Sequence, residues 1–406
     1  MSSYLTLDQL LSAPDIAGRK VLIRADLNVP VTPEGNIRDV TRLDRLLPSL
    51  RELSAAGTKV GILSHFGRPK GEKNIAMSLQ PVAGALSGIL QTEMTFCEDC
   101  IGHNAMSAID NLPAGGFVVF ENTRFHAGEE ANDPAFSRSL ATLASAYIND
   151  AFSTAHRAHA STEGLAHFLP AYAGRAMQAE LEALTAVLEN PQRPVMAVVG
   201  GAKISTKLTL LANLIEKVDK LVIGGGMANT FMAAQGIHIG NSLCEESMLE
   251  QAREIIQLAK TGGCEIILPD DVVLGDNFAP TENPMTVPAD AVPDDKMILD
   301  AGPAAVSKIK AAIDGSKTLV WNGPLGAFEL SPFDQATNLA ARHAALLTQE
   351  GQLVSVAGGG DTVAALNHAG AGDGFSYVST AGGAFLEWLE GKTLPGVQAL
   401  QTANTQ

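Results

Sequence analysis

Residues 198–207 read VVGGAKISTK and combine the end of a buried strand with a turn that leads into a helix. The apolar Val198 and Val199 precede two glycines, and Lys203 and Lys207 then stand four residues apart with no acidic residue near them. Positions i and i+4 share one face of a helix, and the first turns of a helix disfavour cations. This arrangement therefore predicts that the turn binds an anion.

The same pattern, a short apolar run rich in β-branched residues that ends in a turn, recurs along the chain. Longer helical patterns separate these runs, which is typical of βαβ units in mainly parallel sheets. The sequence therefore predicts an α/β fold. The other runs are KVLIRADLNV, KVGILSHFG, GFVVFENTR, AYINDAF, KLVIGGG, EIILPDD, KMILDAG, TLVWNGP and LVSVAGGG.

The length of the chain favours two domains. At 406 residues it exceeds one ordinary core, because domains hold about 150 residues on average. A boundary is expected within residues 172–194, where AELEALTAVLE forms one amphipathic helix and NPQRP ends it. Strand ends before this boundary are rich in arginine and histidine, and those after it are rich in glycine. We expect the two halves to bind different ligands.

The net charge of −16 indicates a surface that repels nucleic acid and anionic membranes. The start MSSYLTLDQL has no basic segment followed by an apolar one, and no uncharged apolar run reaches the roughly 20 residues that a membrane helix needs. We expect a soluble cytoplasmic protein whose partners are small molecules, with neither nucleic acid nor membrane among them.

The four cysteines do not form a disulfide framework. Cys97 and Cys100 make one C-x-x-C with His103 nearby, which leaves a metal or redox site as an alternative. No second pair with ligand spacing follows, so ordinary thiols are favoured.

Basic residues follow several strands of the first half. In IRADLN the alternation puts Arg24, Asp26 and Asn28 on one face of a strand. Ligands of open α/β sheets bind at the carboxyl ends of strands, so these groups should converge on a small polyanion that arginine contacts in a bidentate way. Single arginines of this kind are usually salt-bridged surface residues, but repeated placement favours a site. The further residues are His65, Arg68, Arg124, His156, Arg157 and His159, of which His156 and His159 alternatively orient the loop.

Four glycine-bearing turns follow strands of the second half: VVGGAK, VIGGGMAN, VWNGPLGAFE and VAGGGDTVAAL. Glycine lets the backbone approach a ligand, and a helix N-terminus attracts phosphate, so the turns together predict a nucleotide site. None is a P-loop, and no G-x-G-x-x-G follows the first strand, which disfavours a dinucleotide-dependent oxidoreductase. Asp361 in the last turn is compatible with phosphate when Mg²⁺ lies between them.

These motifs, taken together, resemble the phosphoglycerate kinase family over the whole chain. The resemblance implies two doubly wound parallel-sheet domains of similar size joined by a helical hinge. It implies a 3-phosphoglycerate domain at 1–173, to which 379–406 returns, an interdomain helix at 174–190 and a nucleotide domain at 191–378. The segments that carry it are RADLNVP, SHFGRPKG, ENTRFHAGEE, NDAFSTAHRAHAS, VVGGAKISTK, IGGGMANTF, WNGPLGAFE, GGGDT and STAGGAFLEWLEGKTLPG.

The resemblance also implies the roles of individual residues. Arg42 enters the site through the resemblance alone, and Arg24 would support the basic surface. The implied 3-phosphoglycerate residues are Arg24, Asp26, Asn28, Arg42, His65, Arg68, Arg124 and Arg157. The implied nucleotide residues are Gly201, Lys203, Lys207, Gly224, Gly225, Gly226, Pro324, Glu329, Gly359, Gly360, Asp361 and Thr362, with Asp361 on Mg²⁺. The residues expected to carry catalysis are Arg42, Lys203, Gly382 and Gly383.

The implied reaction transfers a phosphoryl group between 1,3-bisphosphoglycerate and Mg-ADP in a monomeric glycolytic enzyme whose domains close. A carboxylate nucleophile is ionised near neutral pH and needs no general base, which accounts for the missing acid beside the lysines. A catalytically silent binding protein is the alternative, but it would lose Lys203, Arg42 or Asp361, and all three are present. Ser153 and Ala381 stand where the family usually has glycine, and we expect Ala381 to keep a negative φ.

Overall fold

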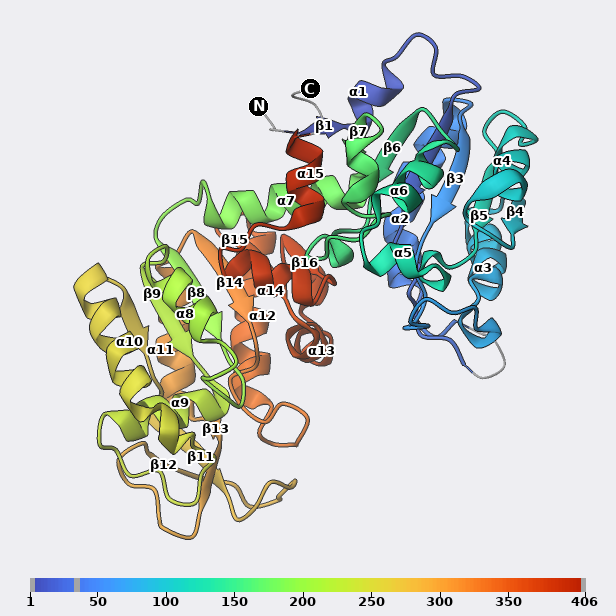
Figure 1. Cartoon of the computed structure of the whole chain (residues 1–406). Helices are drawn as coiled ribbons and strands as arrows, with labels where there is room; N and C mark the ends of the chain where they lie inside the picture. Colours follow the sequence, from blue (N-terminus) through green and yellow to red (C-terminus); the bar gives the residue numbers. More distant parts are fainter. Residues whose placement is uncertain (1–3, 33–36, 403–406) are drawn as a thin grey trace. The chain divides into compact units, whose positions relative to one another are not determined.

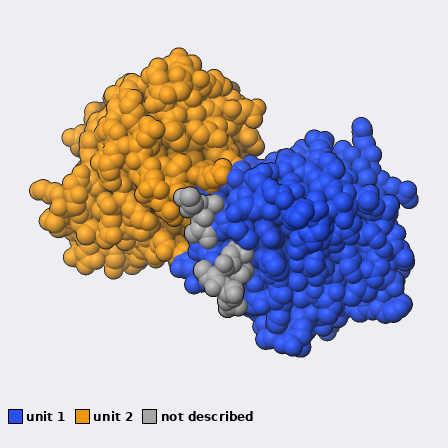
Figure 2. Space-filling view, turned by 90° about the horizontal axis from the view of Figure 1, so that it is seen from above, with its two compact units in different colours: residues 1–181, 393–406 blue, residues 182–392 orange. Residues whose placement is uncertain are grey.

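The structure is a computed structural model that describes residues 4–32 and 37–402 (Figure 1). The chain divides into two compact units: unit 1 comprises residues 1–181 and 393–406, and unit 2 comprises residues 182–392 (Figure 2). The sequence-based prediction has the chain return to the first domain at residue 379. In the structure residues 379–392 belong to unit 2, and the return to unit 1 begins at residue 393. The first boundary falls within the amphipathic helix α7 (Arg175–Leu188), near the expected position.

Unit 1 contains a seven-stranded parallel sheet in the order β1-β7-β6-β2-β3-β5-β4. The order reverses between β2 and β6, which makes the sheet doubly wound. Its strands are β1 (Leu5–Thr6), β2 (Lys20–Arg24), β3 (Lys59–Leu63), β4 (Met94–Cys97), β5 (Phe117–Phe120), β6 (Ala146–Asn149) and β7 (Ala171–Ala173). Its helices flank the sheet (Figure 1) and are α1 (Leu7–Leu11), α2 (Thr41–Ala55), α3 (Gln80–Leu90), α4 (Gly102–Asp110), α5 (Ala127–Glu130), α6 (Pro134–Ala141) and α15 (Pro395–Thr402), with 3₁₀ turns η1 (Ile75–Met77), η2 (Thr123–Phe125), η3 (Phe152–Thr154) and η4 (Gly164–His167).

Unit 2 contains a six-stranded parallel sheet in the order β10-β9-β8-β14-β15-β16, which reverses between β8 and β14. The predicted doubly wound α/β class is therefore confirmed. The strands are β8 (Val195–Val199), β9 (Lys220–Ile223), β10 (Glu265–Ile267), β14 (Thr318–Asn322), β15 (Val354–Gly358) and β16 (Tyr377–Ser379). The helices are α8 (Leu208–Ile215), α9 (Gly225–Ala234), α10 (Leu249–Gly262), α11 (Pro303–Asp314), α12 (Gln335–Gln349), α13 (Gly360–His368) and α14 (Gly383–Leu389), with 3₁₀ turns η5 (Glu246–Met248) and η6 (Gly372–Gly374).

A small antiparallel sheet in unit 2 differs from the expectation of parallel strands. It has the order β12-β11-β13, formed by β11 (Asp271–Gly275), β12 (Met285–Pro288) and β13 (Met297–Ala301). The run EIILPDD, expected as one strand, divides between β10 and β11 because Pro269 separates them and has no N–H for a ladder. The run KMILDAG forms β13 and pairs antiparallel with β11.

The central strands are buried along their whole length, and their residues are mostly apolar, because helices cover both faces of each parallel sheet. All residues of β5, β6, β8 and β14 are buried. Polar residues are therefore concentrated where these strands end, and the turns there carry the candidate sites. Within the described residues, no helix is long and apolar enough to span a membrane.

Candidate functional sites in the two units

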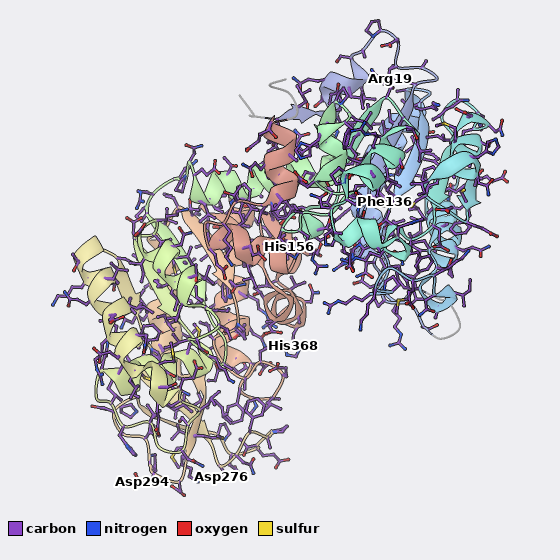
Figure 3. All side chains as sticks on the ribbon, in the orientation of Figure 1. Arg19, Phe136, His156, Asp276, Asp294 and His368 are labelled. Atoms are coloured by element: carbon purple, nitrogen blue, oxygen red, sulfur yellow. The ribbon has the colours of Figure 1, made fainter. Side chains whose placement is uncertain are left out.

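The first candidate site lies at the carboxyl ends of β6, β2, β3 and β5, which are consecutive neighbours in the sheet of unit 1. This adjacency brings together the loops that carry the predicted basic residues. His156, labelled in Figure 3, belongs to the loop after β6, and Arg157 Nε lies 3.1 Å from His156 Nε2. Arg68 lies after β3 and is exposed.

Asp26 holds Arg42 in this site. The Asp26 carboxylate lies 2.9 Å from Arg42 Nη1, which also donates to the backbone oxygen of Asn28 at 3.0 Å. Asn28 Oδ1 accepts the N–H of Gly67 at 3.0 Å and joins the loops after β2 and β3. Ser153 Oγ donates to Asp26 Oδ2 at 2.5 Å, a contact that glycine at this position would not make. Asp26 thus positions the Arg42 guanidinium, and both oxygens of its carboxylate already have partners.

Arg124 is buried in the loop after β5. Its Nη1 donates to the Gly67 oxygen at 2.8 Å, and its Nε lies 3.1 Å from Glu130 Oε1. Burial first, and then the charges of Arg157 and Arg24, lower the pKa of Arg124 to about 10, although the charge of Glu130 opposes them.

The two histidines of the site report its positive potential. Burial first, and then the charges of Arg124, Arg24 and Arg157, lower the pKa of His159 to about 4. Burial and the same arginines hold the pKa of His65 well below its usual value. Cations that depress one another's protonation favour an anionic ligand, which would relieve the repulsion.

Arg24 is placed differently from the other arginines. It is 1 % exposed, and its guanidinium donates to the protein interior. Its support of the basic surface is therefore indirect.

The second candidate site surrounds VVGGAKISTK in unit 2. The expectation that Lys203 and Lys207 share a helix face is wrong, because α8 begins at Leu208 and Lys207 is its N-cap residue with φ −130°. Lys203 is exposed in the preceding loop. Gly201, at φ +142°, turns the chain after β8, before the helix begins at Leu208.

The ammonium group of Lys207 is held by oxygen atoms of two strand ends. Its Nζ donates to the Gly200 oxygen at 2.7 Å, to Asn322 Oδ1 at 2.6 Å and to the Asn322 oxygen at 3.2 Å. Burial lowers the pKa of Lys207 to about 8, opposed by the charge of Asp361. Lys207 therefore ties β8 to β14.

Acidic groups absent from the local sequence approach these lysines in space. Glu245 accepts hydrogen bonds from Ser205 N at 3.1 Å and from Ser205 Oγ at 2.6 Å. Burial raises the pKa of Glu245, but the Ser205 hydrogen bonds and the charge of Lys203 outweigh burial and lower it. The expectation that no carboxylate neighbours the lysines is thus wrong, since Glu245 and Asp361 come from distant segments.

A cavity of about 240 Å³ lies beside this loop within unit 2. Glycine backbone forms one wall and apolar side chains form the others, which suits a flat apolar ring joined to a polar tail. Gly359, Gly360, Thr362, Lys203 and Lys207 are not among its lining residues. The predicted residues that line it are Gly201, Gly224, Gly225, Gly226, Pro324, Glu329 and Asp361, together with Val222, Leu243, Leu299 and Phe328.

Asn322 connects three of the glycine turns and was not singled out from the sequence. Besides accepting from Lys207, its Nδ2 donates to the Gly358 oxygen at 2.7 Å. Thr362 Oγ1 accepts the next N–H, that of Gly323, at 2.7 Å. An asparagine at the end of a fully buried strand was the available signal. Asn28 was predicted differently, from an alternation that put Arg24, Asp26 and Asn28 on one face of a strand, but β2 ends at Arg24 and Asn28 lies in the loop that follows.

Asp300 is a buried carboxyl in the cavity wall that sequence reasoning missed. It accepts the N–H groups of Ala301 and Ala336, each at 2.9 Å. Burial raises the pKa of Asp300 to about 8, against these hydrogen bonds. No local signal distinguishes it from other aspartates at strand ends, because its burial depends on α12.

The proposed phosphoryl-binding turn precedes α14. Gly382 has φ +56°, and α14 begins at Gly383. The described non-glycine residues with positive φ do not include Ala381, as expected. Its N–H donates to Ser379 Oγ at 3.2 Å, so alanine fits this position without backbone strain.

The C-x-x-C motif does not assemble with His103. Within the described ranges, the group of possible metal ligands consists of Asp99, Cys100 and His126, whose ligand atoms lie within 4.8 Å of one another. Asp99 Oδ1 already bonds His126 Nε2 at 2.8 Å and the Cys100 N–H at 2.7 Å. Burial raises the pKa of the Cys100 thiol well above its usual value, as expected of an inert buried thiol.

Comparison with known proteins places these two sites in context. The family model described as phosphoglycerate kinase matches residues 11–392. A protein named phosphoglycerate kinase from Methylobacterium radiotolerans is 60% identical over 401 residues, covering 99% of each chain. The structure of phosphoglycerate kinase from Coxiella burnetii has a TM-score of 0.90 at 40% identity and covers 98% of this chain and 99% of its own. That from Pyrococcus horikoshii has a TM-score of 0.81 at 28% identity, with 99% of each chain covered.

Proposed function

The chain belongs to the phosphoglycerate kinase family, and from this premise we propose which of its residues bind and transfer the phosphoryl group. It is a glycolytic kinase that moves a phosphoryl group reversibly between 1,3-bisphosphoglycerate and ADP, giving 3-phosphoglycerate and ATP. The alternative of a catalytically silent binding protein has no support in the comparisons. One observation carries the assignment of residues: the cationic loops lie in unit 1 and the glycine-walled cavity lies in unit 2.

Unit 1 binds 3-phosphoglycerate in this proposal. Its ligand carries a phosphate and a carboxylate, and arginine side chains suit both groups. The depressed pKa values of His65 and His159 support an anion at this place. Asp26 positions Arg42 by an ion pair of 2.9 Å, and Asn28 joins two of the loops. The proposed ligands are Asn28, Arg42, His65, Arg68, Arg124 and Arg157.

Unit 2 binds the nucleotide in this proposal. The cavity walled by Gly224, Gly225 and Gly226 takes the base and ribose, with Glu329 near the ribose. Phosphates lie toward Gly201, Lys203, Lys207 and the turn of Gly359, Gly360 and Thr362. We propose residues 1–173 as the substrate domain and residues 191–378 as the nucleotide domain of a monomeric, cytoplasmic enzyme.

Magnesium fits the same side of the cavity. Asp361 lies in the first turn of α13, is exposed and lines the cavity. An oxygen donor of this kind is what Mg²⁺ takes from a protein when phosphates supply its other ligands. When bound, the ion neutralises phosphate charge. Asp361 would hold the ion. The charge of the same carboxylate raises the pKa of Lys207 against the effect of burial.

Catalysis in this proposal is alignment and charge stabilisation. The attacking carboxylate is already ionised, so the residues need not remove a proton. The transferring group spreads negative charge over its oxygens, which cations and N–H groups stabilise. Lys203, Arg42 and the N–H groups at Gly382 and Gly383 carry that role.

A coupled assay with Mg-ATP and 3-phosphoglycerate tests the assignment through Lys203→Met. The variant should lose about 10²-fold or more in kcat while retaining nucleotide affinity, because the lost contact forms mainly in the transition state. Lys260→Met, at an exposed position of α10, is the matched control and should keep normal turnover. Near-normal kcat with a raised nucleotide KM would restrict Lys203 to binding.

A further inference from the structure

Arg24 has protein partners for each of its donor nitrogens. It is 1 % exposed, and Nε donates to Ser161 Oγ at 3.0 Å while Nη1 donates to the Ala25 oxygen. Nη2 lies 2.9 Å from His65 Nδ1. A buried guanidinium in contact with these partners is turned away from a ligand and toward a neighbouring side chain.

Ser161 links this guanidinium to a buried countercharge. Its hydroxyl accepts from Arg24, so its own hydrogen is free to go to Glu129 Oε1, which it contacts. The Ser161 N–H donates to Glu129 Oε2 at 2.9 Å, and Glu129 is 0 % exposed. Glu129 also raises the pKa of Arg24 against the effect of burial. A row of four buried groups therefore runs from Glu129 through Ser161 and Arg24 to His65.

The end of this row determines where His65 carries its proton. Arginine offers donors and no acceptor, so His65 Nδ1 must be the unprotonated acceptor of the 2.9 Å contact. His65 is 6 % exposed, and both this burial and the charges of nearby basic groups favour its neutral form. The single proton then belongs to Nε2. These basic groups are Arg24, Arg124, Arg157 and His159.

We propose that Arg24 and Glu129 are positioning residues that act through Ser161 to fix His65 as the neutral tautomer protonated at Nε2. His65 then presents a permanent N–H donor to an anionic group of 3-phosphoglycerate without adding a charge to the cationic loops. This inference rests on the proposed assignment of unit 1 to that substrate. Among the described residues, the hydrogen bond of His65 to a side chain is made at Nδ1, which leaves Nε2 for the ligand.

Nitrogen NMR of the ¹⁵N-histidine-labelled full chain tests the tautomer in the wild-type protein. The signals of His65, assigned by their loss in His65→Gln, should show an unprotonated Nδ1 and a protonated Nε2 at every pH from about 5.5 to 8.5. A proton on Nδ1, or a ring that becomes doubly protonated within this range, overturns the positioning role.

Two variants test the cause. Arg24→Met removes the donor to Nδ1, so His65 should begin to titrate within the same pH range and lose its fixed tautomer. Arg19→Met is the control, because Arg19 bonds Ser145 and lies at the opposite, amino-terminal end of β2 (Figure 3). Ser161→Ala deletes one hydroxyl and serves if Arg24→Met fails to fold. It should raise the KM for 3-phosphoglycerate about threefold to tenfold with kcat unchanged. An unchanged KM and His65 spectrum overturn the proposal.

Amide side chains test which ring nitrogen matters to the substrate. Glutamine places its amide near the position of Nε2, and asparagine places its amide near Nδ1. His65→Gln should keep 3-phosphoglycerate affinity within about tenfold, and His65→Asn should lose about tenfold more. The affinity for ADP, measured by calorimetry, is the reference, because ADP is assigned to unit 2. If both variants bind 3-phosphoglycerate normally while the spectrum shows Nε2–H, the substrate assignment fails and the tautomer stands. Equal losses in both variants overturn the need for a donor at Nε2.

Discussion

Ser153 shows how one side chain adjusts the unit 1 site. Its hydroxyl donates to Asp26 at 2.5 Å, and Asp26 in turn holds Arg42 at 2.9 Å. Ser153→Ala should raise the KM for 3-phosphoglycerate about threefold to tenfold, because one hydrogen bond to a charged group is lost. Steady-state kinetics measure it, with Ser139→Ala as control, since Ser139 bonds its own helix at Ala135. A KM equal to that of the control would mean that Ser153 only fills space.

Asp300 predicts a pH dependence of stability. Its pKa of about 8 in the folded chain exceeds the usual value near 4. Between these values the unfolded chain ionises and the folded chain stays protonated, so the free energy of unfolding falls as pH rises from 4 to 8. Asp300→Asn removes the titrating group, so this contribution to the pH dependence of the free energy of unfolding is lost.

Urea unfolding at several pH values measures the effect of Asp300. From pH 5 to pH 8 the stability of Asp300→Asn relative to wild type should rise by about 2 kcal/mol or more. Any constant loss from replacing a carboxylate oxygen by an amide does not change this slope. Asp290→Asn, at an exposed carboxylate, should show no such change. Parallel pH profiles for wild type and Asp300→Asn would show that Asp300 is ionised in the folded chain.

At the scale of elements, the ends of β8 and β14 approach so closely that they admit no side chain. A Cβ on Gly323, which has φ +107°, would lie 2.2 Å from the Gly200 oxygen. Gly323→Ala should therefore destabilise unit 2 by more than about 2 kcal/mol and abolish ADP binding, because the clash is with backbone.

Gly351→Ala is the matched control for Gly323→Ala. Gly351 also has a positive φ of +71°, but a Cβ there meets nothing within 4 Å. Its cost should stay near 1 kcal/mol, the strain of the backbone alone. Urea unfolding compares the two variants, and equal losses would show that φ rather than the close approach limits this turn.

At the scale of the whole molecule, the two substrates are assigned to different units. Hydrogen exchange should show ADP slowing residues 200–207 and 224–229 of unit 2, and 3-phosphoglycerate slowing residues 24–28 and 65–68 of unit 1. Helix α10 should be unaffected by either ligand. Equal protection of both units by one ligand alone would contradict the assignment.

The sequence by itself determined the fold class and most of the candidate site. Apolar runs that end in turns are local patterns, and parallel strands place their carboxyl ends at one edge, so the loops of Arg24, His65, Arg124 and Arg157 had to meet. The helix at 175–188 was equally predictable from its periodicity.

Only the tertiary structure decided how these residues are used. Burial and hydrogen-bond partners come from segments far apart in the chain, so no local pattern could show them. This is why Arg24 faces His65 and Ser161, why Lys207 bonds the oxygens of Gly200 and Asn322, and why Asp300 keeps its proton. Strand pairing is also nonlocal, which is why the run KMILDAG pairs antiparallel with β11 although its own pattern fits either direction.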